Sequence, residues 1–413
     1  MSEANWANGN ETLLTFCGQV DLRQFLGRRP RVVIGHPYLG RGGSEARIMW
    51  LIEALKLDCD LTVVTTGGWD LQALNRAYGT QVQPQDTEVR LAPFPRLLQR
   101  YPLAMLRWAY YQRFCRQIAD QFDVRISAYN CTDWGLPAIQ FIADFAWDPV
   151  SRNIDGGAPP GLFYRNTPLR KAYLAWARSL MRPSGRDPLR QDWVVANSHW
   201  SARKLAEMGS RVRSVIYPSV WQAFPLAPWE QRENAFVSLS RIASEKRIED
   251  IIQILDAVRR RGYFVNLYLA GSLGHDGYGR YIEDLCRRHG DWVRPVGYVS
   301  GEAKIALLTR CRYSMSACPH EAFGIAVAEM VRAGCIPFVC STSGAAEVVD
   351  HSALLFSNTA EAEERVVNVL DSEQLQAELR NHLARQSERF SLQQTIEGDR
   401  RVVAGFLQEV AAS

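Results

Sequence analysis

The stretch from residue 313 to residue 340 most constrains how this chain can fold. It begins with a short strand-like run that Pro319 ends, because proline cannot donate a ladder hydrogen bond. Apolar residues at helical spacing then extend from Gly324 to about Arg332, and Gly334 follows as a helix stop signal before a second apolar run. The pattern predicts strand, loop, helix and strand, which is the repeating unit of an α/β fold.

The loop before this helix has the chemistry of a site for a phosphorylated polyol. A helix that begins near Gly324 points free N–H groups and the positive end of its dipole at the loop, which favours an anion such as phosphate. Glu321 stands in the loop and Glu329 lies farther along the helix. Carboxylates only accept hydrogen bonds, so the two glutamates suit the hydroxyls of a sugar or a ribose.

The spacing Glu321-x7-Glu329 resembles the Glu-x7-Glu signature of retaining glycosyltransferases of family 4, which have the GT-B fold. The resemblance implies that Glu321 and the backbone amides from Phe323 through Gly324 to Ile325 hold the donor sugar. It also implies that Glu329 binds the ribose. The implied architecture is α/β, with two Rossmann-like doubly wound domains that face each other across a cleft.

The length of the chain, 413 residues, suits two domains with sizeable cores. Strand-like runs alternate with helical stretches, as in parallel sheets covered by helices on both faces. These runs are 31–35, 61–64, 89–92, 124–128, 138–142, 193–196, 214–217, 235–239, 267–272, 293–300, 313–317 and 336–339. With the resemblance they divide the chain into an N-terminal extension (1–29), an acceptor-side domain (30–220), a linker (221–234), a nucleotide-sugar-binding domain (235–390) and a last helix that returns to the first domain (391–413).

A glycine-rich turn follows the first strand-like run and precedes a helical stretch, as in the first unit of a doubly wound domain. Its glycines do not form a full Gly-x-Gly-x-x-Gly fingerprint, so the indication of a dinucleotide is weak. In the family the backbone at the paired glycines, here Gly42 and Gly43, faces the donor phosphate and sugar. The triplet Asp58-Cys59-Asp60 resembles a metal-binding Asp-x-Asp, but it lies at the end of a helix, and we interpret it as solvated loop.

Two cations stand where a strand end meets a helix start in the second half of the chain. Ligands bind at such places in open α/β sheets, and Arg241 and Lys246 both suit a diphosphate. The resemblance implies this role for them, although the family commonly has glycine after the lysine where this chain has Arg247. In the family another strand end meets the nucleobase, which would bring Tyr298 and Val299 close to it.

The chain departs from the family in its first domain. Family members often carry a histidine there that touches the donor sugar, but the segment from Gln140 to Trp147 has none. Ala143 or Asp144 takes its place, depending on the alignment, and Asp144 suits either a sugar hydroxyl or the cap of a turn. His36 and His199 are alternatives, each in a loop or cap position.

The resemblance implies transfer of a hexose from a GDP- or UDP-linked donor to an acceptor hydroxyl, with retention at the anomeric carbon. Arg241, Lys246 and the helix start at 323–325 would stabilise the charge of the departing diphosphate, so neither a metal nor a further cofactor is expected. Glu321 would orient the sugar, and no residue is assignable as a nucleophile. The expected acceptor is a glycan or a lipid-linked acceptor of bacterial polysaccharide or glycolipid assembly.

Three other classes remain open. They are a phosphorylase of the same fold, a catalytically inactive sugar-nucleotide-binding protein, and an oxidoreductase that uses a nicotinamide cofactor.

Two stretches, 96–116 and 165–190, are basic and aromatic, whereas the net charge of the whole chain is only +4. They fit an anionic membrane surface, a basic cleft, or exterior helices with buried aromatic side chains. No nucleic-acid motif accompanies the charge, so nucleic acid is not an expected partner. The nine cysteines form no Cys-x-x-Cys pair, and no run of about 18 apolar residues predicts a spanning helix. We expect a cytoplasmic protein, and the inner face of the membrane is where it would act if the basic stretches bind lipid.

Overall fold

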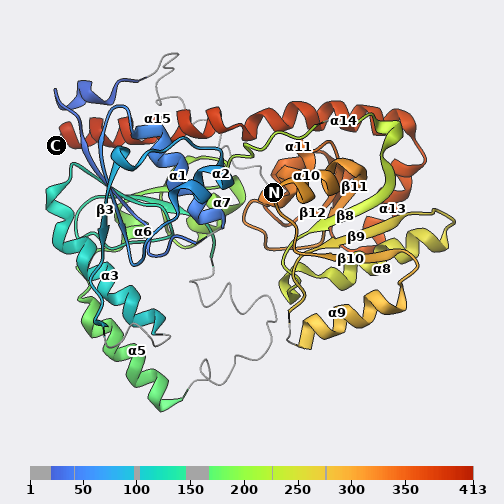
Figure 1. The fold of residues 1–413 in the computed structure, drawn as a ribbon, viewed down its shortest axis with the longest axis horizontal. Helices are drawn as coiled ribbons and strands as arrows, with labels where there is room; N and C mark the ends of the chain where they lie inside the picture. The colour runs from blue at the N-terminus through green and yellow to red at the C-terminus, as the bar shows by residue number, and fades with distance from the viewer. Residues whose placement is uncertain are drawn as a thin grey trace, which may run out of the picture.

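The computed structural model describes residues 20–40, 42–96, 103–145, 167–225, 227–274 and 277–412. Several predictions fall partly outside them, namely those on residues 1–19 of the extension, 97–102 and 165–166 of the basic stretches, 226 of the linker and 413 of the last helix. The described chain forms two lobes, each built on one parallel sheet that helices cover (Figure 1). The predicted α/β class with two doubly wound domains is confirmed.

The first sheet has the order β3-β2-β1-β4-β5-β6-β7, and all its strands are parallel. Its strands are β1 (Arg31–Gly35), β2 (Asp60–Thr65), β3 (Thr87–Leu91), β4 (Val124–Ser127), β5 (Ile139–Ile142), β6 (Trp193–Ala196) and β7 (Val212–Val215). The connecting helices are α1 (Gly43–Leu55), α2 (Leu71–Tyr78), α3 (Ala104–Ile118), α5 (Pro168–Met181), α6 (Pro188–Gln191) and α7 (His199–Glu207). The strand order reverses between β1 and β4, and a crevice opens at such a point.

Strand β1 shows why these runs are apolar at every position. Successive side chains of a strand point to opposite faces of the sheet. Val32 and Ile34 belong to the apolar core that includes α1, whereas Val33 belongs to the core on the side of α3. Because helices cover both faces, each strand needs apolar residues in both directions.

The second sheet has the order β10-β9-β8-β11-β12-β13, also parallel, and its order reverses between β8 and β11. Its strands are β8 (Glu233–Leu239), β9 (Asn266–Ala270), β10 (Val293–Gly297), β11 (Cys311–Ser316), β12 (Ile336–Cys340) and β13 (Leu355–Phe356). The helices are α8 (Ile248–Arg260), α9 (Gly277–Arg288), α10 (Gly301–Arg310), α11 (Ile325–Arg332), α12 (Ala346–Val349), α13 (Thr359–Leu370), α14 (Glu373–Ser387) and α15 (Leu392–Ala411). Strand β13 was not predicted, because two residues are too short for a pattern.

The last helix joins the two lobes. Helix α14 lies along the second lobe and α15 continues in nearly the same line along the first (Figure 1). Val403, Phe406 and Leu407 of α15 belong to the same buried core as strands β1 and β2. The first domain therefore completes its core with the C-terminal segment of the chain.

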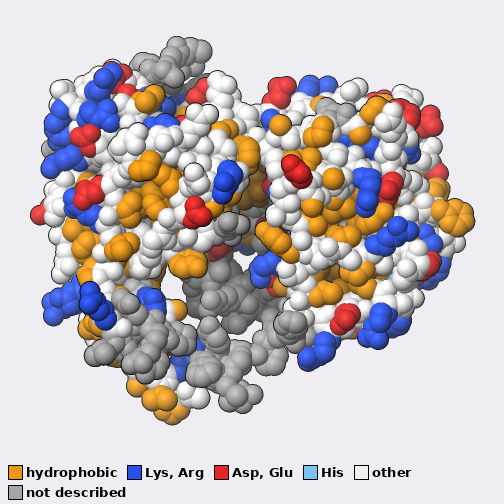
Figure 2. All heavy atoms as spheres, in the orientation of Figure 1, with side chains coloured by type: hydrophobic (Ala, Val, Ile, Leu, Met, Phe, Trp, Pro, Cys, Tyr) orange, Lys and Arg blue, Asp and Glu red, His pale blue; other side chains and the backbone are white. Residues whose placement is uncertain are grey.

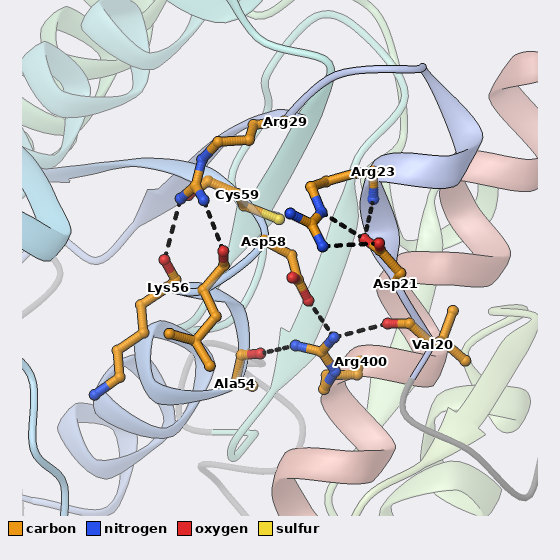
Figure 3. Close-up of polar contacts among 10 residues, drawn as sticks. Val20, Asp21, Arg23, Arg29, Ala54, Lys56, Asp58, Cys59 and Arg400 are labelled. Carbon is orange, nitrogen blue, oxygen red and sulfur yellow. Dashed lines mark hydrogen bonds and ion pairs between the residues drawn. The ribbon is translucent and has the colours of Figure 1, made fainter.

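Polar contacts fix α15 to the end of α1 (Figure 3). Arg400 donates to the carbonyl oxygens of Ala54 at 2.6 Å and Val20 at 2.7 Å, and it forms an ion pair with Asp58. Asp58 and Cys59 are both buried, so the prediction of a solvated triplet is wrong at these two residues. The burial of Asp58 was missed because its partner Arg400 lies far away in the sequence. Asp60 is exposed and pairs with Arg29 at 2.7 Å.

A second, fully buried ion pair joins the same two helices. Arg47 of α1 and Asp399 of α15 lie 2.7 Å apart, and Arg47 also donates to the carbonyl of Ile216 at 3.4 Å. Burial raises the pKa of the Asp399 carboxyl to about 7, although the neighbouring guanidinium of Arg47 opposes this shift. Burial also lowers the pKa of Arg47. Replacing only one partner of this pair would therefore leave a buried charge without compensation and strongly destabilise the fold.

We predict that Asp399→Ala lowers the free energy of unfolding by about 3–5 kcal/mol, because it leaves a buried guanidinium without a partner. The double variant Arg47→Met, Asp399→Leu restores most of this loss, since no charge is then buried. Urea unfolding of both variants measures the difference. A loss in Asp399→Ala no larger than that of a typical surface pair, about 1 kcal/mol or less, contradicts a buried link.

The same carboxyl predicts a pH dependence. Its pKa is higher in the folded chain than the value of about 4 in the unfolded chain, so the folded state binds the extra proton. The stability that it contributes is complete below about pH 4 and is lost as the pH rises to about 7. Asp399→Asn should flatten this part of the unfolding free energy measured against pH. An unchanged slope contradicts the raised pKa.

Candidate functional site

A cavity of about 980 Å³ lies between the two domains. Figure 2 shows the molecule hollowed between its two lobes. The walls come from both sheets, at the ends of strands and the starts of the helices that follow them. The first domain contributes Gly43 and Asp144, among others, and the second contributes Arg241, Lys246 and the loop from Glu321 into α11.

The loop before α11 is built by two tight glycine turns that lie against each other. Gly324 precedes α11 with φ of +91°, and a Cβ there would lie 2.9 Å from the Cβ of Ala345. A Cβ on Gly344 would lie 2.1 Å from the carbonyl oxygen of Ala322, and the Gly344 N–H donates to the Glu321 carbonyl at 2.7 Å. Both positions therefore require glycine, and together they hold the Glu321 backbone and the start of α11 at the cavity wall.

Lys246 and Glu321, which the sequence places 75 residues apart, form an ion pair of 2.5 Å in the cavity wall. Burial, the largest single effect, lowers the pKa of Lys246, but the charge and hydrogen bond of Glu321 together with the nearby Cys318 outweigh it, and the net shift is upward. Lys246 is therefore a cation near neutral pH. Arg241 is the more accessible cation, since its side chain is 79% exposed and pairs with Glu245 at 2.9 Å.

The turn after Lys246 explains the departure at Arg247. Arg247 adopts φ of +50°, the left-handed region, and α8 begins at the next residue. Glycine adopts this conformation without strain, whereas another residue there costs about 1–2 kcal/mol. An ion pair between Arg247 and Asp250 at 2.6 Å accompanies the strained turn. Helix α8 thus starts directly after Arg247, despite the missing glycine.

Across the cavity, the first turn of α1 approaches the start of α11. A Cβ on Gly43 would lie 3.0 Å from Cδ1 of Ile325, so the glycine permits close contact between the domains. Gly42 is not part of the cavity wall, and its backbone exchanges hydrogen bonds with the hydroxyl of Tyr78 at 2.8 and 2.9 Å. Of the predicted pair of glycines, only Gly43 borders the cavity.

Asp144 borders the cavity just after strand β5, in the segment where a histidine was expected from the resemblance and is absent. The Asn130 amide donates to its carboxylate at 3.2 Å, and Asn197 donates to the carbonyl of Ala143 at 2.8 Å. The neighbouring asparagines thus fix both the side chain and its backbone. Neither His36 nor His199 lies in the wall. His36 is buried, and burial lowers its pKa to about 4, so its imidazole is neutral.

Three further predicted residues lie away from the cavity wall, namely Glu329, Tyr298 and Val299. Glu329 pairs with Lys304 of α10 at 2.6 Å. Tyr298 is 73% exposed, whereas Val299 packs partly against the core of the second domain. The structure therefore brings together the predicted residues of the loop, the cations, Gly43 and Asp144, and leaves these three outside.

Several charged residues of this region were not predicted from the sequence, among them Arg47 and Lys304. Arg47 borders the cavity, and the signal for it was a charge next to the buried run Ile48-Met49-Trp50. Lys304 carried no signal, because its link to Glu329 is a tertiary contact. Within the described ranges, no three His, Cys, Asp or Glu side chains form a group able to hold a metal ion. No described helix is both long and apolar enough to cross a membrane.

Residues 219–390 match the family model described as glycosyl transferases group 1. The sequence matches no curated protein. Among solved structures, HepE of Anabaena in complex with UDP and glucose is 17% identical, with a TM-score of 0.62, over 89% of this chain and 97% of that one. Sucrose-phosphate synthase of Thermosynechococcus elongatus is 14% identical, with a TM-score of 0.63, over 89% and 96%.

A third similar structure is WaaG, a glycosyltransferase involved in lipopolysaccharide biosynthesis. It is 14% identical, with a TM-score of 0.59, over 86% of this chain and 95% of that one. These likenesses extend over nearly the whole length of each chain and confirm the predicted GT-B fold.

We predict that Gly324→Ala destabilises the protein more than Gly297→Ala. Both glycines have positive φ, so alanine strains the backbone at each by about 1–2 kcal/mol. Only Gly324 also faces a close neighbour, whereas a Cβ at Gly297 meets nothing within 4 Å. Urea unfolding of both variants isolates the steric part. Equal losses contradict the packing of the two glycine turns.

Proposed function

We propose that this protein transfers a hexose from a nucleoside diphosphate sugar to an acceptor hydroxyl, with retention at the anomeric carbon, as family 4 glycosyltransferases do. The observation that carries the proposal is the Lys246–Glu321 pair beside the start of α11, in a cavity that both domains line. A cation, a carboxylate and a helix start suit a diphosphate joined to a polyol. The match of residues 219–390 to group 1 glycosyl transferases supports the same chemistry.

The donor that we propose is a UDP-sugar, with a GDP-sugar as the alternative. HepE of Anabaena has been solved in complex with UDP-glucose as well as with UDP and glucose. In this chain the Glu329 carboxylate would accept hydrogen bonds from the ribose hydroxyls, while Lys304 neutralises the charge of Glu329. Tyr298 and Val299 would meet the base at the outer edge of the site.

The proposed mechanism rests on stabilising the leaving group. When the glycosidic bond breaks, negative charge grows on the diphosphate, and Lys246, Arg241 and the N–H groups at the start of α11 would stabilise it. Lys246 is neutralised by Glu321 in the free protein, and the incoming diphosphate would share this cation. Glu321 would then orient the sugar hydroxyls, and the domain walls would exclude water, the competing acceptor.

Asp144 would take the place of the missing histidine and accept a hydrogen bond from a sugar hydroxyl. The charges on Lys246 and Arg241 make a metal ion unnecessary in this scheme. The departure at Asp144 also favours a second candidate, a sugar-nucleotide-binding protein without transferase activity. It would bind the donor but release no nucleoside diphosphate.

We predict that UDP-sugars raise the melting temperature of the wild type, because a ligand that binds only the folded state stabilises it. Activity should persist in EDTA, and NMR of the product should show the anomeric configuration of the donor. Glu321→Ala and Lys246→Ala should each lower kcat/KM by at least tenfold, since a charge-assisted hydrogen bond contributes about 1.5–3 kcal/mol.

Lys56→Ala serves as the matched control for Lys246→Ala. Lys56 pairs with Glu53 at 2.8 Å in the first domain, outside the cavity wall, so its loss should leave transfer unchanged. Normal turnover by Lys246→Ala would contradict the proposed site. Binding of UDP-sugar without any release of UDP would favour the inactive binding protein.

We further propose that helices α3 and α5 bring the protein to an anionic membrane that carries a lipid-linked acceptor. The two helices pack side by side and extend from the first lobe (Figure 1), and the hydroxyl of Tyr173 accepts from the N–H of Leu106 at 3.2 Å. Helix α5 exposes Leu169 to 82% and Trp176 to 51%. The exposed Lys171 and Arg178 lie on the same helix, and such a combination suits a membrane surface.

We predict that Lys171→Gln with Arg178→Gln weakens binding to vesicles that contain anionic lipid by roughly thirtyfold, because each basic residue near the surface contributes about 1 kcal/mol. Vesicle co-sedimentation measures the effect, and high salt should weaken wild-type binding too. Arg287→Gln with Arg288→Gln on α9 removes the same charge from the other domain and should have little effect. Equal binding by both double variants contradicts the membrane proposal.

A further inference from the structure

The start of helix α7 in the first domain makes polar contacts with the second domain that are separate from the chain crossings and from α15. Ser198 caps α7, since its hydroxyl oxygen accepts from the Ser201 N–H at 2.9 Å. The same hydroxyl donates to the carbonyl of Ala322 in the second domain at 2.5 Å. The indole of Trp200 donates to the carbonyl of Thr342 at 2.6 Å.

Glu347 of α12 provides three of these contacts. Its carboxylate accepts the backbone N–H groups of His199 at 2.9 Å and Trp200 at 2.5 Å, and the hydroxyl of Tyr217 at 3.2 Å. The first N–H groups of a helix have no partner within the helix, and a negative charge there interacts favourably with its dipole. Here the charge comes from the other domain, 147 residues away from Trp200 in the sequence.

These contacts reach the residues of the cavity on both sides. Ala322 stands directly after Glu321, whose carbonyl is held by the Gly344 N–H. On the first domain, Asn197 precedes Ser198 and donates to the carbonyl of Ala143, directly before Asp144. The start of α7 therefore links the strand end that carries Asp144 to the loop that carries Glu321.

Tyr217, which donates to Glu347, also lies at the chain crossings between the domains. Tyr217 packs its ring against Phe323 at 5.5 Å and Phe390 at 5.4 Å between ring centroids. The Val220 N–H donates to the carbonyl of Phe390 at 2.8 Å, and the Thr395 hydroxyl donates to that of Tyr217 at 3.0 Å. The two segments that connect the domains therefore contact each other at one place. The domains can rotate relative to each other about this place as a hinge.

We propose that Glu347 and Ser198 are positioning residues that form an interdomain latch, which holds the two walls of the cavity at the separation the reaction needs. Without the latch, the carbonyl of Ala322 and the first N–H groups of α7 form their hydrogen bonds with water instead. The domains then open about the crossing segments. The catalytic consequence rests on the proposed function, whereas the opening itself does not. A merely structural role would lower stability without changing the distance between the domains.

The test compares Glu347→Ala with Glu361→Ala. Glu361 accepts the N–H and the hydroxyl of Ser357 at 2.8 and 2.7 Å, so it caps a helix in a similar way, but within the second domain alone. Small-angle X-ray scattering should show a larger radius of gyration for Glu347→Ala than for the wild type, and none of this increase for Glu361→Ala. Glu347→Gln retains one acceptor oxygen, so its radius of gyration should lie between those of Glu347→Ala and the wild type.

Enzyme assays then test the catalytic consequence. In Glu347→Ala the release of nucleoside diphosphate without transfer should rise at least threefold relative to transfer, because an open cavity admits water. The donor KM should change less than kcat, since the donor loop remains intact. Ser198→Ala should shift the same ratio in the same direction by a smaller factor.

The outcomes separate the latch from the proposed function. An unchanged radius of gyration in a folded Glu347→Ala variant overturns the latch, whatever the activity. If the radius of gyration increases in Glu347→Ala but the wild type transfers no sugar, the latch is supported and the proposed function is contradicted. If Glu347→Ala does not fold, scattering from Glu347→Gln decides by the same criterion.

Discussion

The arrangement of this protein depends on how its last helix completes the first domain. Helix α15 starts beside the second lobe, crosses to the first and inserts Val403, Phe406 and Leu407 into the core around β1 and β2. The buried Arg47–Asp399 pair and the Arg400–Asp58 pair fix its position along α1. Because the same chain also connects the domains near Tyr217, two separate crossings restrict how the two sheets face each other, and the cavity lies between them.

Three ion pairs lie at the cavity or in the neighbouring part of the second domain in the free protein. Lys246 holds Glu321, Lys304 holds Glu329 and Arg241 holds Glu245. Unpaired carboxylates would repel a diphosphate, and unpaired buried cations would be costly to desolvate. Pairing reduces both the repulsion of the diphosphate and the desolvation cost of the cations. The cations can still bind a diphosphate, which has more acceptor oxygen atoms than a carboxylate. It also gives both glutamates of the motif a partner from another element, so that they are held in place before a ligand arrives.

Much of the fold was readable from the sequence because a doubly wound domain repeats one pattern. Each predicted strand-like run matches a strand, and the helix predicted from the apolar spacing after Gly324 is helix α11. The burial of Asp58 was not predictable, since its partner Arg400 follows 342 residues later. The position of Arg247 in a left-handed turn became clear only from its backbone angle.

For the candidate site, the sequence indicated which loops meet but not how their side chains pair. Motif spacing singled out Glu321 and Lys246, yet nothing in the spacing indicated that they contact each other, and Lys304 and Glu347 depend on tertiary packing alone. Glu329, Tyr298 and Val299 lie outside the cavity wall of the free protein. Which side chains border an interdomain cavity is set by the relative orientation of two domains, and no local pattern encodes that orientation.

The proposed function depends on the binding of a diphosphate between Lys246 and the start of α11. A crystal structure of the protein soaked with a UDP-sugar would show whether the diphosphate binds there. We expect diphosphate oxygens within hydrogen-bond distance of the Lys246 ammonium and of the N–H groups at residues 323–325, with Glu321 on the sugar hydroxyls. A nucleotide bound elsewhere, with the Lys246–Glu321 pair undisturbed and the cavity empty of diphosphate, would contradict it.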